Sequence, residues 1–236
     1  MKTFVINLDK EKTRMASIDV QLSQLGVIYE RISAVYGKEL TKDELKCSFS
    51  AFRSFCAMGH RLTLGEIGCA LSHISVYRQI IDENIPYALV FEDDIIVDDS
   101  FKVRITEIEK FIDEKKAQVI LLSALGYNAK EDGIYRRDQG MCTDAYVITL
   151  KAAREIYKSN NPVVVVADKW QRWAKRFGVE IYTCWPPIVQ QDNETFGTDV
   201  NTTNRKVIKG GLKWLRKAKR LPEVFIDWLW FKISSK

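Results

Sequence analysis

Three consecutive carboxylates end one strongly apolar segment of the sequence. Pro86-Tyr-Ala-Leu-Val-Phe91 is followed directly by Glu92, Asp93 and Asp94, and no lysine or arginine follows before Lys102. Neighbouring carboxylates raise one another's pKa unless a cation neutralises them. Oxygen ligands of this kind suit Mg²⁺ or Mn²⁺, held together with the phosphates of a substrate. The triplet therefore indicates a metal-bound nucleotide diphosphate, with a solvated acidic turn as the alternative.

The elements around this triplet predict an α/β fold, because apolar strand-like segments alternate with segments of helical spacing. Strands are expected at residues 3–8, 29–32, 87–91, 119–122, 143–148 and 180–185, and helices at 14–25, 42–46, 63–83, 101–115, 150–159 and 168–177. Ligands of an open α/β sheet gather at the carboxyl ends of its strands. The strand at 87–91 is apolar throughout, as a central strand is, so its carboxyl end is the predicted site.

A capping box predicts the start of the helix at 63–83. The Thr63 hydroxyl can accept a backbone hydrogen bond while Glu66 reaches back to the cap, so Glu66 is expected to cap first and to bind a ligand second. His73 is expected beside the core face, where a core role and a functional role are both open. The predicted apolar stripe contains Leu64, Ile67, Leu71, Ile74 and Ile81, and the neighbouring stripe contains Glu66, Cys69, Ala70, His73 and Tyr77.

The composition fits one catalytic-size domain with a tail. The chain has 236 residues, 46% of them hydrophobic, and we expect a domain over residues 1–200 and a separate segment over 201–236. No window reaches the eighteen or so apolar residues of a membrane span, and the N-terminus turns polar too early for a signal peptide. Five cysteines without a CxxC spacing predict reduced thiols. A cytoplasmic protein is therefore expected.

The net charge of +5 is concentrated near the C-terminus. Between Asp199 and Glu223 eight residues are basic and none is acidic, and the aromatic-rich segment 224–231 follows. Basic residues interleaved with tryptophan suit the interface of an anionic membrane. Residues 205–233, as a basic amphipathic helical tail, are therefore expected to bind an anionic membrane surface. A tail helix packed on the domain is the alternative.

Asn7 and Arg14 lie where the first predicted strand meets the first helix, a natural place for nucleotide contacts. The guanidinium of Arg14 can bind a phosphate through two hydrogen bonds. A solvated helix residue is the alternative for Arg14.

Three segments in order resemble glycosyltransferase family 25. They are Gly65-Glu-Ile-Gly-Cys-Ala-Leu-Ser-His73, Pro86-Tyr-Ala-Leu-Val-Phe-Glu-Asp-Asp94 and Cys142-Thr-Asp-Ala-Tyr-Val-Ile-Thr-Leu-Lys-Ala-Ala153. The opening Val5-Ile-Asn-Leu-Asp9 with Arg14 is similar to the start of that family, so the resemblance covers roughly residues 1–195. It implies a GT-A type fold, in which a Rossmann-like mixed sheet flanked by helices binds a sugar nucleotide.

The resemblance also implies an activity and roles for site residues. Members of the family transfer a sugar with inversion, often galactose from UDP-galactose, to a lipooligosaccharide or lipopolysaccharide core, with a divalent metal that is usually Mn²⁺. The triplet takes the place of the DXD-like motif, which implies that Glu92 and Asp94 hold the metal and that Glu92 and Asp93 contact the donor. Ser72, His73 and Gln191 match residues implied near the donor, and Asp192 would complete the metal site.

An inverting transfer needs a general base near the acceptor hydroxyl. Asp168 matches the aspartate of a Pro-Val-Asp segment of the family, although the proline is missing here. Asp168 is therefore the implied base, with a helix N-cap as the structural alternative. Asp144 is the rival base.

The sequence thus predicts a bacterial-type, cytoplasmic glycosyltransferase, peripheral on the inner face of the inner membrane. Its expected partners are a UDP-sugar, Mn²⁺ or Mg²⁺ and a lipid-linked oligosaccharide acceptor. UDP-glucose or UDP-N-acetylhexosamine is the alternative donor. A non-catalytic protein that binds a membrane surface or nucleic acid through its basic tail is the alternative from another class. No nucleic-acid partner is expected, because basic and aromatic residues interleave in the tail alone.

Overall fold

A computed structural model describes residues 1–137, 140, 142–192 and 194–196. The segment 201–236, with the predicted membrane contact at 205–233, lies outside these residues. The strands are β1 (Lys2–Asn7), β2 (Glu30–Ser33), β3 (Tyr87–Glu92), β4 (Ile95–Val97), β5 (Val119–Leu121), β6 (Gly133–Arg136), β7 (Ala145–Thr149), β8 (Ile181–Trp185) and β9 (Val189–Gln191). The helices are α1 (Lys12–Gln24), α2 (Lys42–Ser48), α3 (Ala51–Met58), α4 (Leu64–Asp82), α5 (Phe101–Lys115), α6 (Leu150–Asn160) and α7 (Trp170–Phe177), with a 3₁₀ turn η1 (Gly37–Glu39).

A seven-stranded mixed sheet forms the centre of the fold, in the order β2-β1-β3-β7-β5-β8-β6. β1 pairs parallel with β2 and β3, and β5 pairs parallel with β8, whereas β7 is antiparallel to β3 and β5, and β6 is antiparallel to β8. β1, β2, β3, β5 and β8 therefore end at one edge of the sheet. β7 begins at that edge, and the small sheet β4-β9 lies beyond it.

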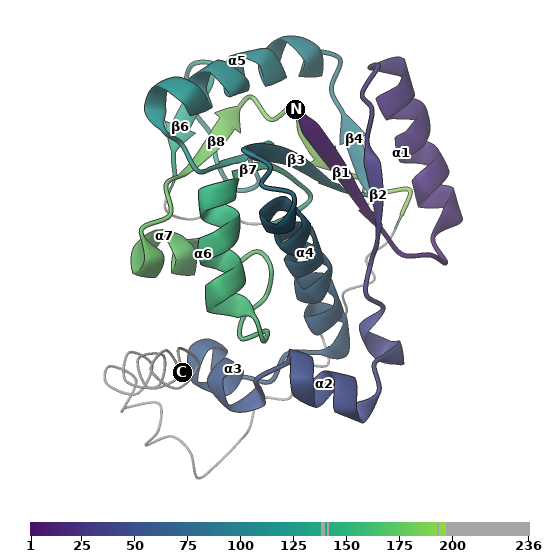
Figure 1. Ribbon diagram of the computed structural model, residues 1–236. Helices are drawn as coiled ribbons and strands as arrows, with labels where there is room; N and C mark the ends of the chain where they lie inside the picture. The colour runs from purple at the N-terminus through teal and green to yellow at the C-terminus, as the bar shows by residue number, and fades with distance from the viewer. Residues whose placement is uncertain (138–139, 141, 193, 197–236) are drawn as a thin grey trace.

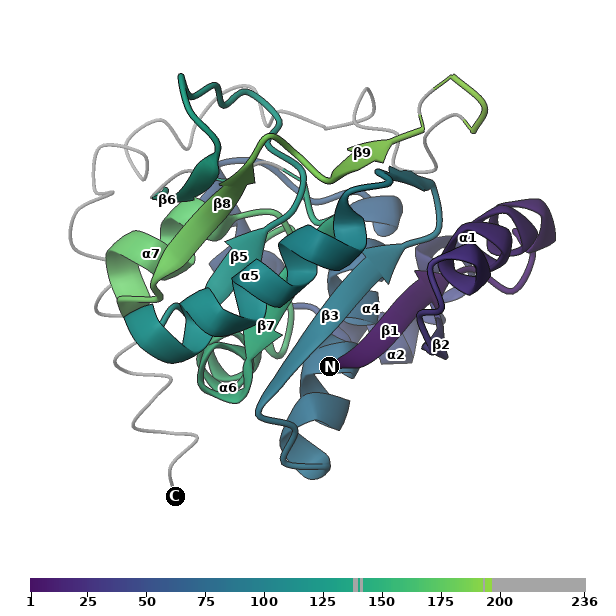
Figure 2. The same cartoon turned by 90° about the horizontal axis from the view of Figure 1, so that it is seen from above.

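Helices cover both faces of the large sheet (Figures 1 and 2). α1 and α5 lie on one face, and α4 and α6 lie on the other. Successive residues of a strand point to opposite faces, so the strands supply two cores. Phe4 and Val90 belong to the core under α4 and α6, and Val5 and Phe91 belong to the core under α1 and α5. The mixed α/β sheet flanked by helices, expected for a GT-A type fold, is the architecture observed.

Side-chain caps start two helices where the sequence predicts them. Thr63 accepts a hydrogen bond from the Glu66 amide at 3.2 Å, and the Glu66 carboxylate accepts one from the Thr63 amide at 2.7 Å. Thr149 likewise accepts a hydrogen bond from the Ala152 amide at 3.4 Å, at the start of α6. The capping box thus fixes the start of α4, the helix that contains Ser72 and His73.

The buried face of α4 differs from the predicted stripe. Leu64 is 40% exposed, whereas His73 and Tyr77 are 1% and 2% exposed. The rings of His73 and Tyr77 both lie against Tyr146 of β7, with centroids 5.7 and 6.4 Å away. The prediction that His73 lies beside the core face is therefore wrong: it lies within that face, because Tyr146 of the central strand β7 packs against this side of the helix.

Four elements were not predicted from the sequence: α3 and the short strands β4, β6 and β9. Strands of three or four residues are too short to show a clear period. β4 and β9 matter for the site, because their antiparallel register places Ile95 opposite Gln191. None of the described helices is long and apolar enough to cross a membrane. The five cysteines are free thiols.

The start of α4 touches the loop after β2 backbone to backbone. A Cβ on Gly68 would lie 2.5 Å from the Val35 carbonyl oxygen and 2.7 Å from the Gly37 amide nitrogen. A Cβ on Gly37 would lie 1.8 Å from the Leu64 carbonyl oxygen. Glycine at both positions is thus required by the close approach.

We expect Gly68→Ala to lower the free energy of unfolding by about 1–3 kcal/mol, the usual cost of adding a methyl group to a filled space. Urea unfolding followed by far-ultraviolet circular dichroism measures the change. Arg78→Ala, on the exposed side of α4, is the control and should stay within about 0.5 kcal/mol of the original chain. Unchanged stability of Gly68→Ala would contradict the close packing.

Candidate active site

A cleft lies at the carboxyl ends of β1, β2 and β3. Its walls are the segment after β1, the loop at 34–38, the first turns of α4 and the triplet Glu92 to Asp94. Parallel strands of an α/β sheet collect their ligands at this edge. Asp93 and Asp94 are only 7% and 6% exposed, so the triplet lines the cleft and is not a solvated turn.

Glu92 is held by side chains from two other elements. His73 Nε2 lies 3.0 Å from Glu92 Oε1, and the Thr143 hydroxyl donates to the same oxygen at 2.7 Å. Burial raises the pKa of Glu92, but hydrogen bonding and charge from His73, with Thr143 and Arg14, outweigh burial and lower this pKa overall. Glu92 is therefore a carboxylate at neutral pH.

Asp93 is held by β1 and α1. Asn7 Nδ2 donates to Asp93 Oδ2 at 2.5 Å, and Arg14 Nη1 lies 3.6 Å from Asp93 Oδ1. Asn7 is 2% exposed, and its amide also donates to the Glu11 carbonyl and accepts from Arg31. Arg14 lines the cleft and Asn7 does not. Asn7 thus orients Asp93, while Arg14 faces the place where a ligand would bind.

Asp94 carries the clearest sign of a missing partner. Its Oδ2 accepts a hydrogen bond from Gln191 Nε2 at 3.1 Å, and Arg14 Nη1 lies 3.9 Å away. Its Oδ1 is buried and has no hydrogen-bond partner in the described part of the chain. Burial, and then the charge of Glu92, raise the pKa of Asp94 to about 6. A cation beside Oδ1 would remove both penalties.

The donor set fits a hard divalent cation. Glu92 and Asp94 present carboxylate oxygens to the same cleft, and such oxygens are the ligands that Mg²⁺ and Mn²⁺ prefer. The unsatisfied Oδ1 of Asp94 is where an ion would be bound. The residues present thus suit the metal that the resemblance implies.

A second pocket adjoins the cleft. Cys69, Glu92 and Gln191 line both, and the second pocket also contains Asp144 and Asp168. Ligands in the two pockets would therefore meet beside Glu92. Such an arrangement suits a reaction between two bound substrates, because it brings their reacting groups together.

Asp168 lines this second pocket and lies two residues before α7. α7 begins at Trp170 with Lys169 at the N-cap position, and the Asp168 carbonyl accepts a hydrogen bond from the Trp170 amide at 2.8 Å. Asn160 fixes the preceding loop, because its Oδ1 accepts from the Val164 amide at 2.9 Å. The helix thus begins two residues later than predicted, with Lys169 and not Asp168 at its N-cap position.

Asp144 is the other carboxyl group of the second pocket. The Ser123 hydroxyl donates to its Oδ1 at 2.5 Å, and the Ala145 amide donates at 3.0 Å. Burial raises the pKa of Asp144 to about 7, although the Ser123 hydrogen bond opposes this and the Glu92 charge adds to it. A pKa near the working pH suits a general base. The alternative between Asp168 and Asp144 therefore stays open.

Ser72 and Asp192 use their side chains within the fold. Ser72 Oγ donates to the Gly68 carbonyl and accepts from the Val35 amide, both at 2.8 Å. Asp192 Oδ1 accepts from the Thr195 amide at 3.0 Å, and Asp192 is not among the residues that line the cleft. Their roles toward donor and metal stay predictions.

Two residues of the site were not singled out from the sequence. Tyr36 lines the cleft, and Lys10 Nζ lies 4.2 Å from the centre of its ring. An aromatic residue just after the second strand was the available signal. Thr143 donates to Glu92, and it lies inside the segment that carries the family resemblance, which was the signal for it.

The sequence of the chain is similar to known proteins of one family. The profile of glycosyltransferase family 25, described as an LPS biosynthesis protein, matches residues 1–137. Procollagen galactosyltransferase 2 of Homo sapiens is 29% identical in an alignment of length 174 that covers 66% of this chain and 27% of the relative. Procollagen galactosyltransferase 1-A of Xenopus laevis is 34% identical in an alignment of length 107 that covers 44% of this chain and 18% of the relative. Inactive glycosyltransferase 25 family member 3 of Mus musculus is 27% identical in an alignment of length 170 that covers 67% of this chain and 29% of the relative.

Two solved structures superpose on part of the chain with low TM-scores. A glycosyltransferase involved in glycosylation of the major capsid of PBCV-1 superposes with a TM-score of 0.37 and 11% identity, over 75% of this chain and 74% of that one. A197 from STIV superposes with a TM-score of 0.43 and 10% identity, over 78% of this chain and 81% of that one. Likenesses this distant carry no argument about function.

The chain spans about a quarter of the length of the human relative it matches. The family profile covers residues 1–137, more than half of the chain, and these residues contain α4, β3 and the triplet. The chain belongs to glycosyltransferase family 25.

Proposed function

We propose that this protein transfers galactose from UDP-galactose to a hydroxyl of a lipooligosaccharide or lipopolysaccharide core, with inversion and with bound Mn²⁺ or Mg²⁺. The observation that carries the proposal is Asp94. Its Oδ1 is buried without a hydrogen-bond partner among the described residues, in a cleft shared with the Glu92 carboxylate. A cation that also binds a diphosphate would satisfy both groups.

The cleft supplies groups for a nucleotide diphosphate. Glu92 and Asp94 would hold the ion, whose charge offsets the negative charge on the departing diphosphate. Arg14 lines the same cleft, and its guanidinium lies within 4 Å of the carboxylates of Asp93 and Asp94. Those carboxylates orient Arg14 for contact with a phosphate. Tyr36 offers a ring for stacking with the base.

The second pocket supplies the base. Asp168 would accept the proton of the acceptor hydroxyl while the hydroxyl oxygen bonds to the anomeric carbon and the bond from that carbon to the diphosphate oxygen breaks. Inversion requires that the acceptor in the second pocket and the diphosphate in the cleft lie on opposite sides of the sugar. Attack from that side inverts the anomeric carbon.

The relatives support the choice of sugar. Two of them are called procollagen galactosyltransferases, and the family description as an LPS biosynthesis protein supports a saccharide acceptor. One relative is described as inactive, so transfer must be measured directly. UDP-glucose and UDP-N-acetylhexosamine are the donors to compare, and a procollagen peptide is the acceptor to compare.

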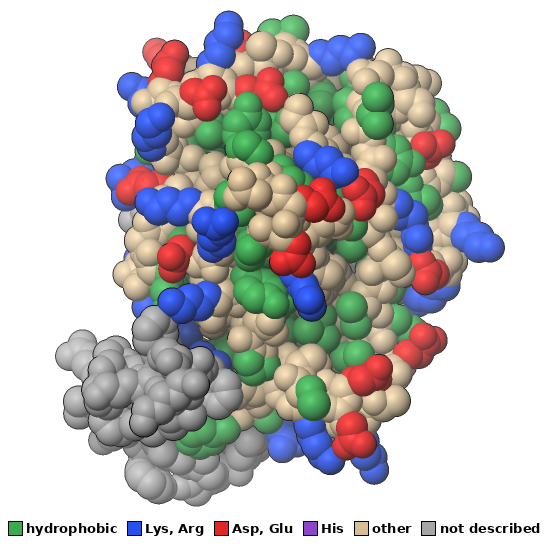
Figure 3. Space-filling view, in the orientation of Figure 1, with side chains coloured by type: hydrophobic (Ala, Val, Ile, Leu, Met, Phe, Trp, Pro, Cys, Tyr) green, Lys and Arg blue, Asp and Glu red, His purple; other side chains and the backbone are tan. Residues whose placement is uncertain are grey.

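The non-catalytic alternative would act through the basic tail, which lies outside the described residues, and the described face seen in Figure 3 adds no support for it. On the face seen in Figure 3, acidic and basic side chains are interspersed, whereas a nucleic-acid interface gathers basic side chains into one patch or stripe. A peripheral position on the inner membrane, through residues 205–233, remains part of the proposal. It rests on the sequence of that segment alone.

We expect Asp94→Asn to lower the affinity for Mn²⁺ by at least about 100-fold, since loss of a residue that merely supports a ligand costs about 10- to 100-fold. Electron paramagnetic resonance of free Mn²⁺, in a titration with UDP present, measures the affinity. Asp98→Asn removes an exposed carboxylate that accepts from the Ser100 amide, and this control should bind Mn²⁺ as the original chain does. Equal affinity of Asp94→Asn and the control would remove Asp94 from the metal site.

We expect Asp168→Asn to slow transfer by about 100- to 10,000-fold, the usual contribution of a general base. UDP affinity should change little, because Asp168 lies in the second pocket. Product formation from UDP-galactose, followed by mass spectrometry, measures the rate. Asp144→Asn is the matched comparison. A fast Asp168→Asn variant together with a slow Asp144→Asn variant would assign the base to Asp144.

A further inference from the structure

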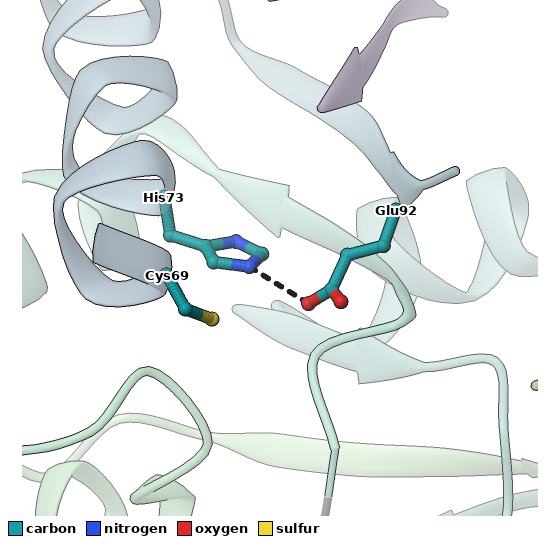
Figure 4. Close-up of side chains that lie close together, drawn as sticks. All are labelled: Cys69, His73 and Glu92. Atoms are coloured by element: carbon teal, nitrogen blue, oxygen red, sulfur yellow. Dashed lines mark hydrogen bonds and ion pairs between the residues drawn. The ribbon is translucent and has the colours of Figure 1, made fainter. Parts of the chain in front are cut away.

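The side chains of Cys69, His73 and Glu92 point toward one another (Figure 4), and Cys69 and Glu92 line both pockets. Cys69 and His73 are four residues apart on α4, so their side chains leave the same face of the helix. Glu92 reaches them from the end of β3. Cys69 Sγ, a ring nitrogen of His73 and a carboxylate oxygen of Glu92 all lie within 4.8 Å of one another.

These separations can be compared with those of a tetrahedral metal site. Zinc bonds of about 2.3 Å to sulfur and about 2.0–2.2 Å to nitrogen and oxygen place neighbouring ligands about 3.3–3.6 Å apart. His73 Nε2 and Glu92 Oε1 are 3.0 Å apart. A small movement of the three side chains would therefore admit an ion between them.

The histidine is held as metal-binding histidines are. His73 Nδ1 lies 2.7 Å from the Tyr146 hydroxyl, and that hydroxyl donates to the Tyr77 hydroxyl at 3.1 Å. The Tyr146 oxygen can then accept a hydrogen bond from the protonated Nδ1, which leaves the lone pair of Nε2 for an ion. Such a partner on the far nitrogen fixes the ring and raises ligand basicity.

We propose that Cys69, His73 and Glu92 form a binding site for a thiophilic divalent cation such as Zn²⁺, with a fourth position left for water or a ligand. Thiolate and imidazole ligands select Zn²⁺ over Mg²⁺ and Mn²⁺. Three protein ligands with one open position is the arrangement of sites that are not purely structural. Because Cys69 and Glu92 line both pockets, such an ion would be accessible from either.

Binding exchanges protons for the ion. The metal–sulfur bond forms as the Cys69 thiol loses its proton to solvent. The metal–nitrogen bond forms at Nε2 of His73 while the ring proton is on Nδ1. Burial raises the pKa of the Cys69 thiol well above its usual value, and the charge of Glu92 adds to this. The thiol is thus protonated until an ion arrives, so binding should release protons.

The site would share Glu92 with the proposed Mn²⁺ or Mg²⁺ site. A thiophilic ion bound to Glu92 would remove that ligand from the catalytic ion. Zn²⁺ would then act as an inhibitor that competes with Mn²⁺. The site itself rests on the three side chains and does not depend on the proposed transfer reaction.

Titration of the full chain with Co²⁺ tests the proposal. We expect the intense visible bands of a tetrahedral ion and a near-ultraviolet charge-transfer band from thiolate to cobalt, both displaced by Zn²⁺. Cys69→Ser and Cys69→Ala should lose the charge-transfer band while their circular dichroism stays unchanged. Cys142→Ser, which removes the other thiol of the second pocket, is the matched control and should keep it.

Tyr146→Phe provides a second readout, because it removes the hydroxyl that holds His73 and keeps the buried ring. We expect a Co²⁺ affinity about 10- to 100-fold lower, the usual effect of losing a supporting partner. Absence of the charge-transfer band in the original chain, or its persistence in Cys69→Ser, would overturn the proposal. A chain that shows this band but fails to bind UDP with Mn²⁺ would separate this site from the proposed function.

Discussion

Three consecutive carboxylates at the end of β3, with Asp93 and Asp94 buried and Glu92 partly buried, are the constraint on which the rest of the structure depends. A buried carboxylate is costly without a partner, and one neighbouring element cannot reach all three. α4 and the segment before β7 hold Glu92, β1 and α1 hold Asp93, and β9 holds Asp94. The order of the mixed sheet brings these elements to one edge, although they lie far apart in the sequence. One buried oxygen of the triplet, Asp94 Oδ1, is left without a hydrogen-bond partner among the described residues.

The parts of the site that follow from local pattern could be predicted from the sequence. The apolar run before Glu92 and the capping box at Thr63 each depend on neighbouring residues, and both appear in the structure as predicted. The contacts across the sheet could not be predicted in this way. Pairing of β3 with β7 brings Asp144 to the Glu92 amide, and no local pattern reveals that pairing.

Short strands, one helix boundary and the position of His73 account for the remaining differences between the predicted and the observed site. β4 and β9 have three residues each, yet their pairing brings Gln191 to Asp94. α7 begins at Trp170, two residues later than expected, so Asp168 lies before the helix and lines the second pocket. His73 shows that a core position and a site position can coincide, because one nitrogen faces buried Tyr146 and the other faces Glu92.

Glu92 lines both pockets, so a nucleotide in the cleft would lie next to an acceptor in the second pocket. Nucleotide binding at this site is proposed to depend on a cation. Calorimetric titration of the original chain with UDP, first with Mn²⁺ and then with a chelator, tests this claim most directly. We expect UDP to bind with Mn²⁺ and not with the chelator, because a diphosphate beside Glu92, Asp93 and Asp94 needs a cation between the negative charges. Equal binding under both conditions, or binding under neither, would contradict it.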